Sequence, residues 1–274
     1  MMLKLHSFII IIMLVFTGFS TLSQENTQII YKEINGVSLE MDACYPMNFT
    51  ETETYPAMLL FHGGGWKKGD QNDLGEVANY FTGRGFITFL VSYRVKFEHG
   101  TNPLEAVKDT KSAIRYVRKH AEQLYVDPSK IVVSGISAGG HLAATSAANS
   151  TFNNIANDLS VSAQANALIL YCPLLDIGPG GYGYHAIAEN YLELSPLHII
   201  KDGLPPTIII VGTKDRYLSM DTAKLYATKM KEAGNICELI FLRGVEHGFL
   251  WKDKPQLTNT ILQASETFLQ EYGF

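Results

Sequence analysis

The sequence lacks the features that mark several large classes of binding and metal-dependent proteins. Its 274 residues carry 22 lysines and arginines against 27 acidic side chains, so no basic excess is available to neutralise nucleic-acid phosphates. No HExxH motif and no cluster of Cys and His at metal-ligand spacing occurs, and no expected strand runs into a Gly-x-Gly-x-x-Gly turn. We therefore expect no nucleic-acid partner, no metal and no cofactor.

Cysteine is scarce as well. The three cysteines, Cys44, Cys172 and Cys237, each lie in or beside an expected strand, and their number is odd. We expect them to be small buried side chains, with a disulfide as the weaker alternative.

The amino terminus has the composition of an export signal. One lysine precedes an apolar block from Phe8 to Phe16, and small or polar residues follow. We expect cleavage after Ser23, with Ser20 as the competing position, and a mature protein that is periplasmic or secreted. An uncleaved anchor is the alternative, because residues 3–22 just reach the length of about 20 residues that spans a bilayer. No later segment resembles a membrane span.

Residues 24–274 contain no Pro/Ser-rich linker, charge run or internal repeat, so we expect a single domain. Continuous apolar runs such as "AMLLF" and "TIIIV" predict strands that are covered on both faces, and apolar residues at three- and four-residue spacing predict helices between them. Strands are expected at 27–34, 38–45, 57–61, 86–92, 131–134, 167–171, 207–212 and 237–242, and helices at 73–82, 104–124, 138–149, 220–233 and 256–272. This alternation predicts an α/β fold with a mainly parallel sheet.

The segment "GISAGG" places Ser137 where an expected strand changes directly into a helix. Gly135 and Gly139 stand two residues to either side, and glycine there lets neighbouring backbone approach without a Cβ clash. The turn lifts the serine above the sheet, and the amide of Ala138 has no intrahelical acceptor and can bind a negative oxygen. The pattern predicts Ser137 as a nucleophile; a plain turn is the alternative.

A second glycine-rich loop, "HGGGW", follows the first core strand. Glycines in this loop can turn their amides inward without obstruction by side chains. Gly64 and Gly65 are therefore candidates to join Ala138 in holding the oxyanion of a tetrahedral intermediate. His62 and His141 lie within the two motifs and are expected to brace the packing.

A serine hydroxyl needs a base, and the base works best when a carboxylate fixes its tautomer. Asp215 follows the strand "TIIIVG" and His247 follows the next strand, which gives the chain order Ser, Asp, His that this topology favours. Asp176 is the weaker candidate for the acid. Arg94 and Asp70 are expected to brace backbone near the site.

Taken in order, "HGGGW", "GISAGG", "GTKD" and "EHGF" resemble the α/β-hydrolase superfamily over essentially the whole mature chain. More narrowly they resemble the hormone-sensitive-lipase-like esterases and the BD-FAE-type carbohydrate esterases. "SYR" and "SPLHIIKDGLPPTIIIVGTKD" are closer to the second group, where acetyl xylan and feruloyl esterases are found. The resemblance implies an α/β-hydrolase fold and roles for six residues: Ser137 as nucleophile, His247 as base, Asp215 as orienting acid, and Gly64, Gly65 and Ala138 as oxyanion donors.

Residues 172–206 interrupt the rhythm of strands and helices at the place where such folds carry a lid. The segment is short and polar, and its stretch "GPGGYGYH" is rich in glycine and tyrosine. Trp66, Tyr182 and Tyr184 are candidates to line a sugar-binding cleft, because aromatic faces stack on sugars; an ordinary packed loop is the alternative.

These observations predict an exported serine carboxylesterase that removes acetyl groups from small-molecule or carbohydrate esters such as acetylated xylan. The alternatives are a general short-chain esterase, a formamidase-like amidase and, from another class, an inactive hydrolase-like binding protein. The sequence gives no indication of the oligomeric state.

Overall fold

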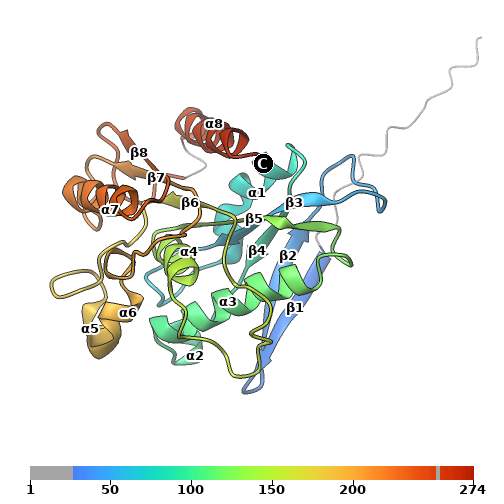
Figure 1. Cartoon of the computed structure of the whole chain (residues 1–274), viewed down its shortest axis with the longest axis horizontal. Helices are drawn as coiled ribbons and strands as arrows, with labels where there is room; N and C mark the ends of the chain where they lie inside the picture. The colour runs from blue at the N-terminus through green and yellow to red at the C-terminus, as the bar shows by residue number, and fades with distance from the viewer. Residues whose placement is uncertain (1–26, 251–253) are drawn as a thin grey trace, which may run out of the picture.

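The fold is built on an eight-stranded sheet in the order β1-β2-β4-β3-β5-β6-β7-β8. The computed structural model describes residues 27–250 and 254–274 (Figure 1). β1–β2 and β2–β4 pair antiparallel, and the other neighbours pair parallel. The strands are β1 (Thr27–Ile34), β2 (Val37–Cys44), β3 (Tyr55–Phe61), β4 (Ile87–Val91), β5 (Val126–Ile136), β6 (Ala167–Tyr171), β7 (Thr207–Gly212) and β8 (Cys237–Leu242).

Helices cover both faces of this sheet. α1 and α8 lie on one face and α3, α4 and α7 on the other, and each side has its own cluster of buried apolar side chains (Figure 1). The helices are α1 (Gly75–Thr82), α2 (Lys96–His99), α3 (Pro103–Lys119), α4 (Ala138–Ala148), α5 (Tyr184–Ile187), α6 (Tyr191–Leu194), α7 (Met220–Glu232) and α8 (Pro255–Glu271), with 3-10 turns η1 (Gln71–Leu74), η2 (Ala188–Asn190) and η3 (Pro196–His198). The predicted fold class is confirmed.

The strand β3 shows why the sequence folds in this way. Successive side chains of a strand point to opposite faces. Leu59 and Phe61 accordingly join the cluster under α3 and α4, whereas Met58 and Leu60 join the cluster under α1 and α8, and all four are fully buried. A strand with apolar residues at every position is therefore stable only between two helical layers.

The boundary between α3 and β5 differs from the prediction. The helix ends at Lys119, before the expected residue 124, and the strand begins at Val126. Ala121 and Leu124 are buried in the intervening turn and so continue the apolar spacing beyond the end of the helix. Tyr125, with φ of 57°, then redirects the chain into β5.

The predicted placement of the cysteines can be compared with the structure, whereas the predicted export signal and the single-domain assignment cannot. The three cysteines are buried at the end of β2, after β6 and at the start of β8, which confirms their expected placement. The predicted export signal, residues 1–23, lies outside the described residues, and the single-domain assignment of 24–274 stays a prediction. No helix within the described ranges has both the length and the apolar character needed to cross a bilayer.

Candidate active site

Ser137 lies in a strained turn between β5 and α4. Its φ of 55° and ψ of −115° are outside the conformations that a residue with a Cβ ordinarily adopts. The glycines two residues away make the turn possible: a Cβ on Gly135 would overlap the backbone of Gly139, and a Cβ on Gly139 would overlap the carbonyl oxygen of Phe61. Strand β3, strand β5 and helix α4 can therefore meet closely under the serine.

Backbone hydrogen bonds hold this turn in place. The Ser137 amide donates to the carbonyl oxygen of Tyr171 at 2.9 Å, and the Ser137 carbonyl accepts from the amide of His141 at 3.0 Å. Ala138 is the first residue of α4 and is fully buried. Its amide is one of the helix-terminal donors without an intrahelical acceptor, at the positive end of the helix dipole.

The loops that follow β7 and β8 are joined to each other. A Cβ on Gly212 would overlap the carbonyl oxygen of Val245, so only glycine allows the two loops this close approach. The amide of Lys214 then donates to that same oxygen at 2.9 Å. These contacts fix the relative positions of Asp215 and His247.

The two loops deliver an acid and a base to the serine. The Oδ1 atom of Asp215 accepts hydrogen bonds from the amides of Tyr217 and Leu218 at 2.8 and 2.9 Å. Its Oδ2 atom lies 2.7 Å from Nδ1 of His247, and Nε2 of the same imidazole lies 2.8 Å from Oγ of Ser137. With the Nδ1 proton held by the carboxylate, Nε2 is left to accept the serine proton.

The structure thus brings together the three predicted residues from loops that follow three different strands. Asp176, the weaker candidate for the acid, is elsewhere: its Oδ1 accepts from the amide of Gly178 at 2.9 Å and lies 3.9 Å from Nδ1 of His198. The Asp215 side chain is fully buried, and the His247 side chain is 15 % exposed. The base is therefore reachable from solvent while its partner is shielded from it.

The two candidate oxyanion glycines border the same cavity as the serine. Gly64 and Gly65 have φ values of 96° and 63°, which favour glycine. Neither amide donates a backbone hydrogen bond among the described residues. The cavity has a volume of about 320 Å³ and is lined by Gly64, Gly65, Lys67, Lys68, Phe97, Ser137, Leu174, Tyr182, Tyr217 and His247.

Tyr93 and the start of α2 hold the backbone of the glycine loop. The hydroxyl of Tyr93 donates to the carbonyl oxygens of His62 and Gly63, and the imidazole of His62 stacks on the same tyrosine ring at 4.1 Å. The amides of Lys96 and Phe97 donate to the carbonyl oxygens of Trp66 and Lys67, both at 2.9 Å. The start of α2 and the residues just before it, 94–97, therefore fix the backbone of the loop.

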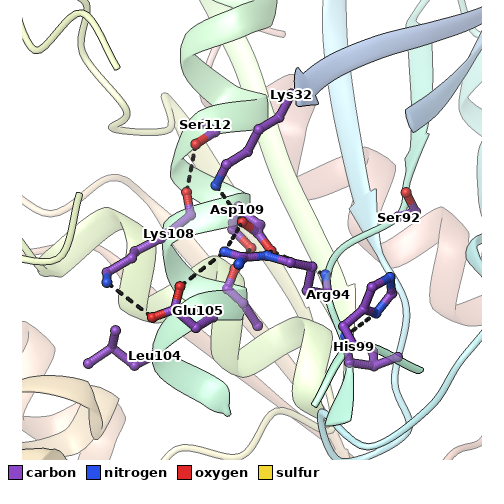
Figure 2. A network of polar contacts seen from close by, with 12 residues as sticks. Lys32, Ser92, Arg94, His99, Leu104, Glu105, Lys108, Asp109 and Ser112 are labelled. Atoms are coloured by element: carbon purple, nitrogen blue, oxygen red, sulfur yellow. Dashed lines mark hydrogen bonds and ion pairs between the residues drawn. The ribbon is translucent and has the colours of Figure 1, made fainter. Parts of the chain in front are cut away.

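That segment is in turn anchored by a buried ionic network around Arg94 (Figure 2). Nε and Nη2 of Arg94 donate to the carboxylate of Asp109 on α3, both at 2.8 Å, and Nη2 also lies 3.1 Å from Glu105. Lys32 from β1 binds the same Asp109 carboxylate. Arg94 thus anchors this segment to the carboxylates of α3, and its side chain makes no hydrogen bond to backbone within the described residues. Asp70 contacts backbone locally, where its Oδ1 accepts from the amide of Asn72 in η1.

Several known proteins resemble this chain in sequence or in structure. The BD-FAE family model matches residues 41–172. Carboxylesterase NlhH of Mycobacterium tuberculosis is 30% identical over 227 residues, 72% of this chain and 67% of the relative. An acetylxylan esterase of Xylanibacter ruminicola is 26% identical over 70% of this chain and 41% of the relative. A native esterase structure from Thermogutta terrifontis has a TM-score of 0.86 at 36% identity, over 91% of this chain and 93% of its own.

The chain belongs to the α/β-hydrolase esterase family. It is a serine hydrolase of the carboxylesterase class. The predicted resemblance is therefore confirmed at the level of the family.

The three residues predicted to bind substrate are placed differently in this esterase. Tyr182 lines the Ser137 cavity and also an adjoining cavity of about 210 Å³. Trp66 is buried and borders only the second cavity, with its ring packed edge-on against His141 at 4.8 Å. Tyr184 borders neither cavity and packs against Tyr191 at 5.7 Å, so the structure does not bring it to the site.

Sequence reasoning missed several residues of the cavity. Tyr217 packs edge-on against His247 with ring centroids 4.7 Å apart, and its place two residues after Asp215 was an available signal. Phe97 belongs to the four-residue helix α2, which carries no periodicity that a sequence pattern can detect. Leu174 follows β6 at the start of the segment predicted to form a lid.

A buried thiol lies beside the acid and the base. Ligand atoms of Cys172, Asp215 and His247 lie within 4.8 Å of one another, the one such group with metal-like spacing among the described residues. Burial raises the pKa of the Cys172 thiol to about 12, so the thiol is protonated at neutral pH. Because Asp215 and His247 are already hydrogen-bonded to each other, the cluster is not organised to bind a metal ion.

Proposed function

We propose that this esterase removes short acyl groups, acetyl above all, from carbohydrate esters by forming an acyl-enzyme on Ser137. One observation carries the proposal: Ser137, His247 and Asp215 form a continuous hydrogen-bonded chain whose serine opens into a small cavity. The chemistry that this arrangement supports is nucleophilic acyl transfer.

In the first half of the reaction, Oγ of Ser137 attacks the ester carbonyl carbon while its proton passes to Nε2 of His247. The carbonyl oxygen becomes an oxyanion, and in this proposal the amides of Gly64, Gly65 and Ala138 donate hydrogen bonds to it. The bond from carbon to the leaving oxygen then breaks, the proton on His247 passes to that oxygen, and the alcohol departs.

In the second half, a water molecule gives a proton to His247 and its oxygen attacks the acyl carbon. The same amides hold the second oxyanion, and the bond to Oγ of Ser137 breaks as the proton returns to the serine. The short acid is released. Asp215 keeps the imidazole in one orientation throughout and stabilises it when it is protonated.

The size of the cavity supports a short acyl group. Its 320 Å³ must hold both the acyl group and the alcohol, and this is near the lower end of the range of about 300–1,000 Å³ for small-molecule sites. Structures of the Thermogutta terrifontis esterase are described as propionate-bound and butyrate-bound. The carbohydrate assignment is supported by the BD-FAE match and by the acetylxylan esterase relative.

A general short-chain carboxylesterase is the second candidate. The higher identity to the Mycobacterium tuberculosis carboxylesterase and to the Thermogutta terrifontis esterase favours it.

A substrate panel separates the two candidates. Acetylated xylan, acetylated monosaccharides, feruloyl esters and 4-nitrophenyl esters of increasing acyl length would be compared by kcat/KM. We expect acetyl to exceed longer acyl groups and sugar acetates to exceed 4-nitrophenyl acetate after correction for the leaving-group pKa. A best rate on 4-nitrophenyl octanoate, or no turnover of any sugar acetate, would refute the carbohydrate assignment.

The Ser137 mechanism is tested by substitution at the site. Because such a triad acts as a unit, Ser137→Ala and His247→Ala should each lower turnover by about a millionfold, and Asp215→Asn by about four orders of magnitude. Asp176→Asn is the matched control and should have little effect. A loss of less than tenfold in Ser137→Ala would exclude a serine nucleophile.

Export is part of the proposal and is supported by the composition of residues 1–23 alone. Amino-terminal sequencing of protein recovered from the cell envelope and medium should find a chain that begins after Ser23 or Ser20. Recovery in the cytoplasm with residues 1–23 attached would contradict it.

A further inference from the structure

Lysine side chains border the two cavities beside Ser137, and the one carboxylate of the triad, Asp215, is buried behind His247 and lines neither cavity. The 320 Å³ cavity and the adjoining 210 Å³ cavity share Gly65, Lys67 and Tyr182 as a common wall. Lys68 also borders the first cavity and Lys96 the second. No aspartate or glutamate is among the described residues that line either one. This is unusual in a chain whose net charge is −5.

The three lysines are also not neutralised from outside the cavities. Lys67, Lys68 and Lys96 are exposed, and none of them forms an ion pair with another residue in the described ranges. The acidic residues nearest to them along the chain, Asp70 and Glu98, border a separate polar cavity. Lysines without an ion-pair partner at the borders of the two cavities can therefore attract an anionic ligand.

A row of aromatic rings connects the two cavities. Trp66 and Tyr182 have ring centroids 5.9 Å apart, Tyr182 and Tyr217 are 5.2 Å apart, and Tyr217 is 4.7 Å from the His247 ring. Aromatic faces bind the apolar faces of sugar rings, and in this row Tyr182 and Tyr217 border the first cavity whereas Trp66 is buried behind them. Since the first cavity is small, an oligosaccharide whose acetylated sugar lies at Ser137 must place its next sugar elsewhere, and the second cavity adjoins along this row.

We propose that the preferred substrate is an acetylated oligosaccharide that carries a carboxylate, as a uronic acid does, on the sugar beside the acetylated one. The acetylated sugar occupies the Ser137 cavity, and the carboxylate lies in the second cavity near Lys96 and Lys67. This inference rests on the proposed function and narrows its substrate class.

The test compares two substrates that differ only in the charge. One is an acetylated xylo-oligosaccharide bearing a glucuronosyl substituent, and the other is the same compound after its carboxylate has been reduced to the primary alcohol. We expect a higher kcat/KM for the acidic compound, by about fivefold or more at low ionic strength, and a smaller difference in 0.5 M NaCl, because salt screens exposed charges.

Two lysine variants locate the effect. Lys96→Gln and Lys67→Gln should each reduce the ratio of the two kcat/KM values by about two- to fivefold, the size of one exposed charge interaction. Lys229→Gln, at an exposed lysine on α7, is the matched control and should change neither substrate. Equal kcat/KM values for the two substrates, or a ratio that survives both variants, would overturn the inference while leaving the proposed function intact.

Two further outcomes would refute either the carbohydrate function or the placement of the carboxylate. Hydrolysis of 4-nitrophenyl acetate without turnover of either oligosaccharide would refute the carbohydrate function and this inference with it. If 4-nitrophenyl monosuccinate is preferred over 4-nitrophenyl butyrate and this preference depends on the lysines, the lysines recognise a carboxylate on the acyl group. That result would overturn the placement of the carboxylate on the alcohol part of the substrate.

Discussion

Replacement of Asp109 by asparagine should destabilise the fold severely. The Asp109 carboxylate on α3 is fully buried and holds two cationic side chains, Arg94 and Lys32, which are themselves only 6% and 7% exposed. It also accepts from the amide of Arg94 at 3.2 Å. Asparagine keeps the volume but leaves both cations buried without a counter-charge at that position (Figure 2).

The expected size follows from this burial. Removing one partner of a buried ion pair costs about 3–5 kcal/mol, a large part of the roughly 5–15 kcal/mol that stabilises a typical domain. For a protein of this size, Asp109→Asn should lower Tm by about 6–20 °C. Urea unfolding followed by circular dichroism should show a lower midpoint with an unchanged m-value.

Glu105→Gln is the control, because Glu105 also contacts Arg94 but its side chain is 28% exposed. Its loss should cost at most about 1 kcal/mol. Burial also lowers the pKa of Lys32, so in Asp109→Asn this lysine can release its proton more easily than in the unfolded chain, and the destabilisation should shrink as the pH rises toward the ordinary lysine pKa. If the Asp109 and Glu105 variants unfold at the same midpoint, the network does not act as a buried anchor.

Three further predictions concern single buried groups. Burial lowers the pKa of His141 to about 4, so below about pH 6.5 the unfolded chain binds a proton that the folded chain does not. The free energy of unfolding should therefore fall by up to about 3 kcal/mol between pH 6.5 and 4. In urea titrations, His141→Gln should remove this part of the pH dependence. Since burial raises the pKa of Cys172 to about 12, iodoacetamide at pH 8 should label it only after unfolding, and mass-spectrometric detection of rapid labelling in the native protein would contradict this. Gly212→Ala should lower kcat by at least about tenfold, because the added Cβ pushes against Val245 and separates the loops that carry the acid and the base. Gly75→Ala is the control and should leave kcat unchanged, because a Cβ there meets open space.

The strands and the three central side chains were predictable from the sequence. β1, β6, β7 and β8 have the predicted bounds: β1 ends at the Asn35-Gly36 turn, and the apolar runs within β6, β7 and β8 are flanked by proline, glycine or polar residues. Ser137 and His247 are 110 residues apart, yet each lies in the connection that follows a parallel strand. The carboxyl ends of parallel strands lie along one edge of the sheet, so this rule alone predicts that the loops meet.

The surroundings of the site were not predictable in the same way. The helices α5 and α6 in the predicted lid have only four residues each, too few for a periodic pattern. Tyr182 and Tyr184 are two positions apart in a similar context, and only the packing of Tyr184 against Tyr191 decides that it stays away from the cavity. Such choices depend on contacts between distant segments.

Strained backbone conformations explain why the conformational preferences of single residues do not predict the structure around this site. Trp66, Ser137 and Cys172, three of the six described non-glycine residues with positive φ, all lie on segments that border it. Each conformation costs roughly 1–3 kcal/mol and persists only where the surroundings over-determine it. Here the Ser137 amide binds the end of β6, and the Cys172 amide binds the Ile210 carbonyl on β7 at 2.8 Å. The buried sheet therefore supplies the free energy that holds the serine in a conformation its own sequence disfavours, and the turn should relax if those strand ends are loosened.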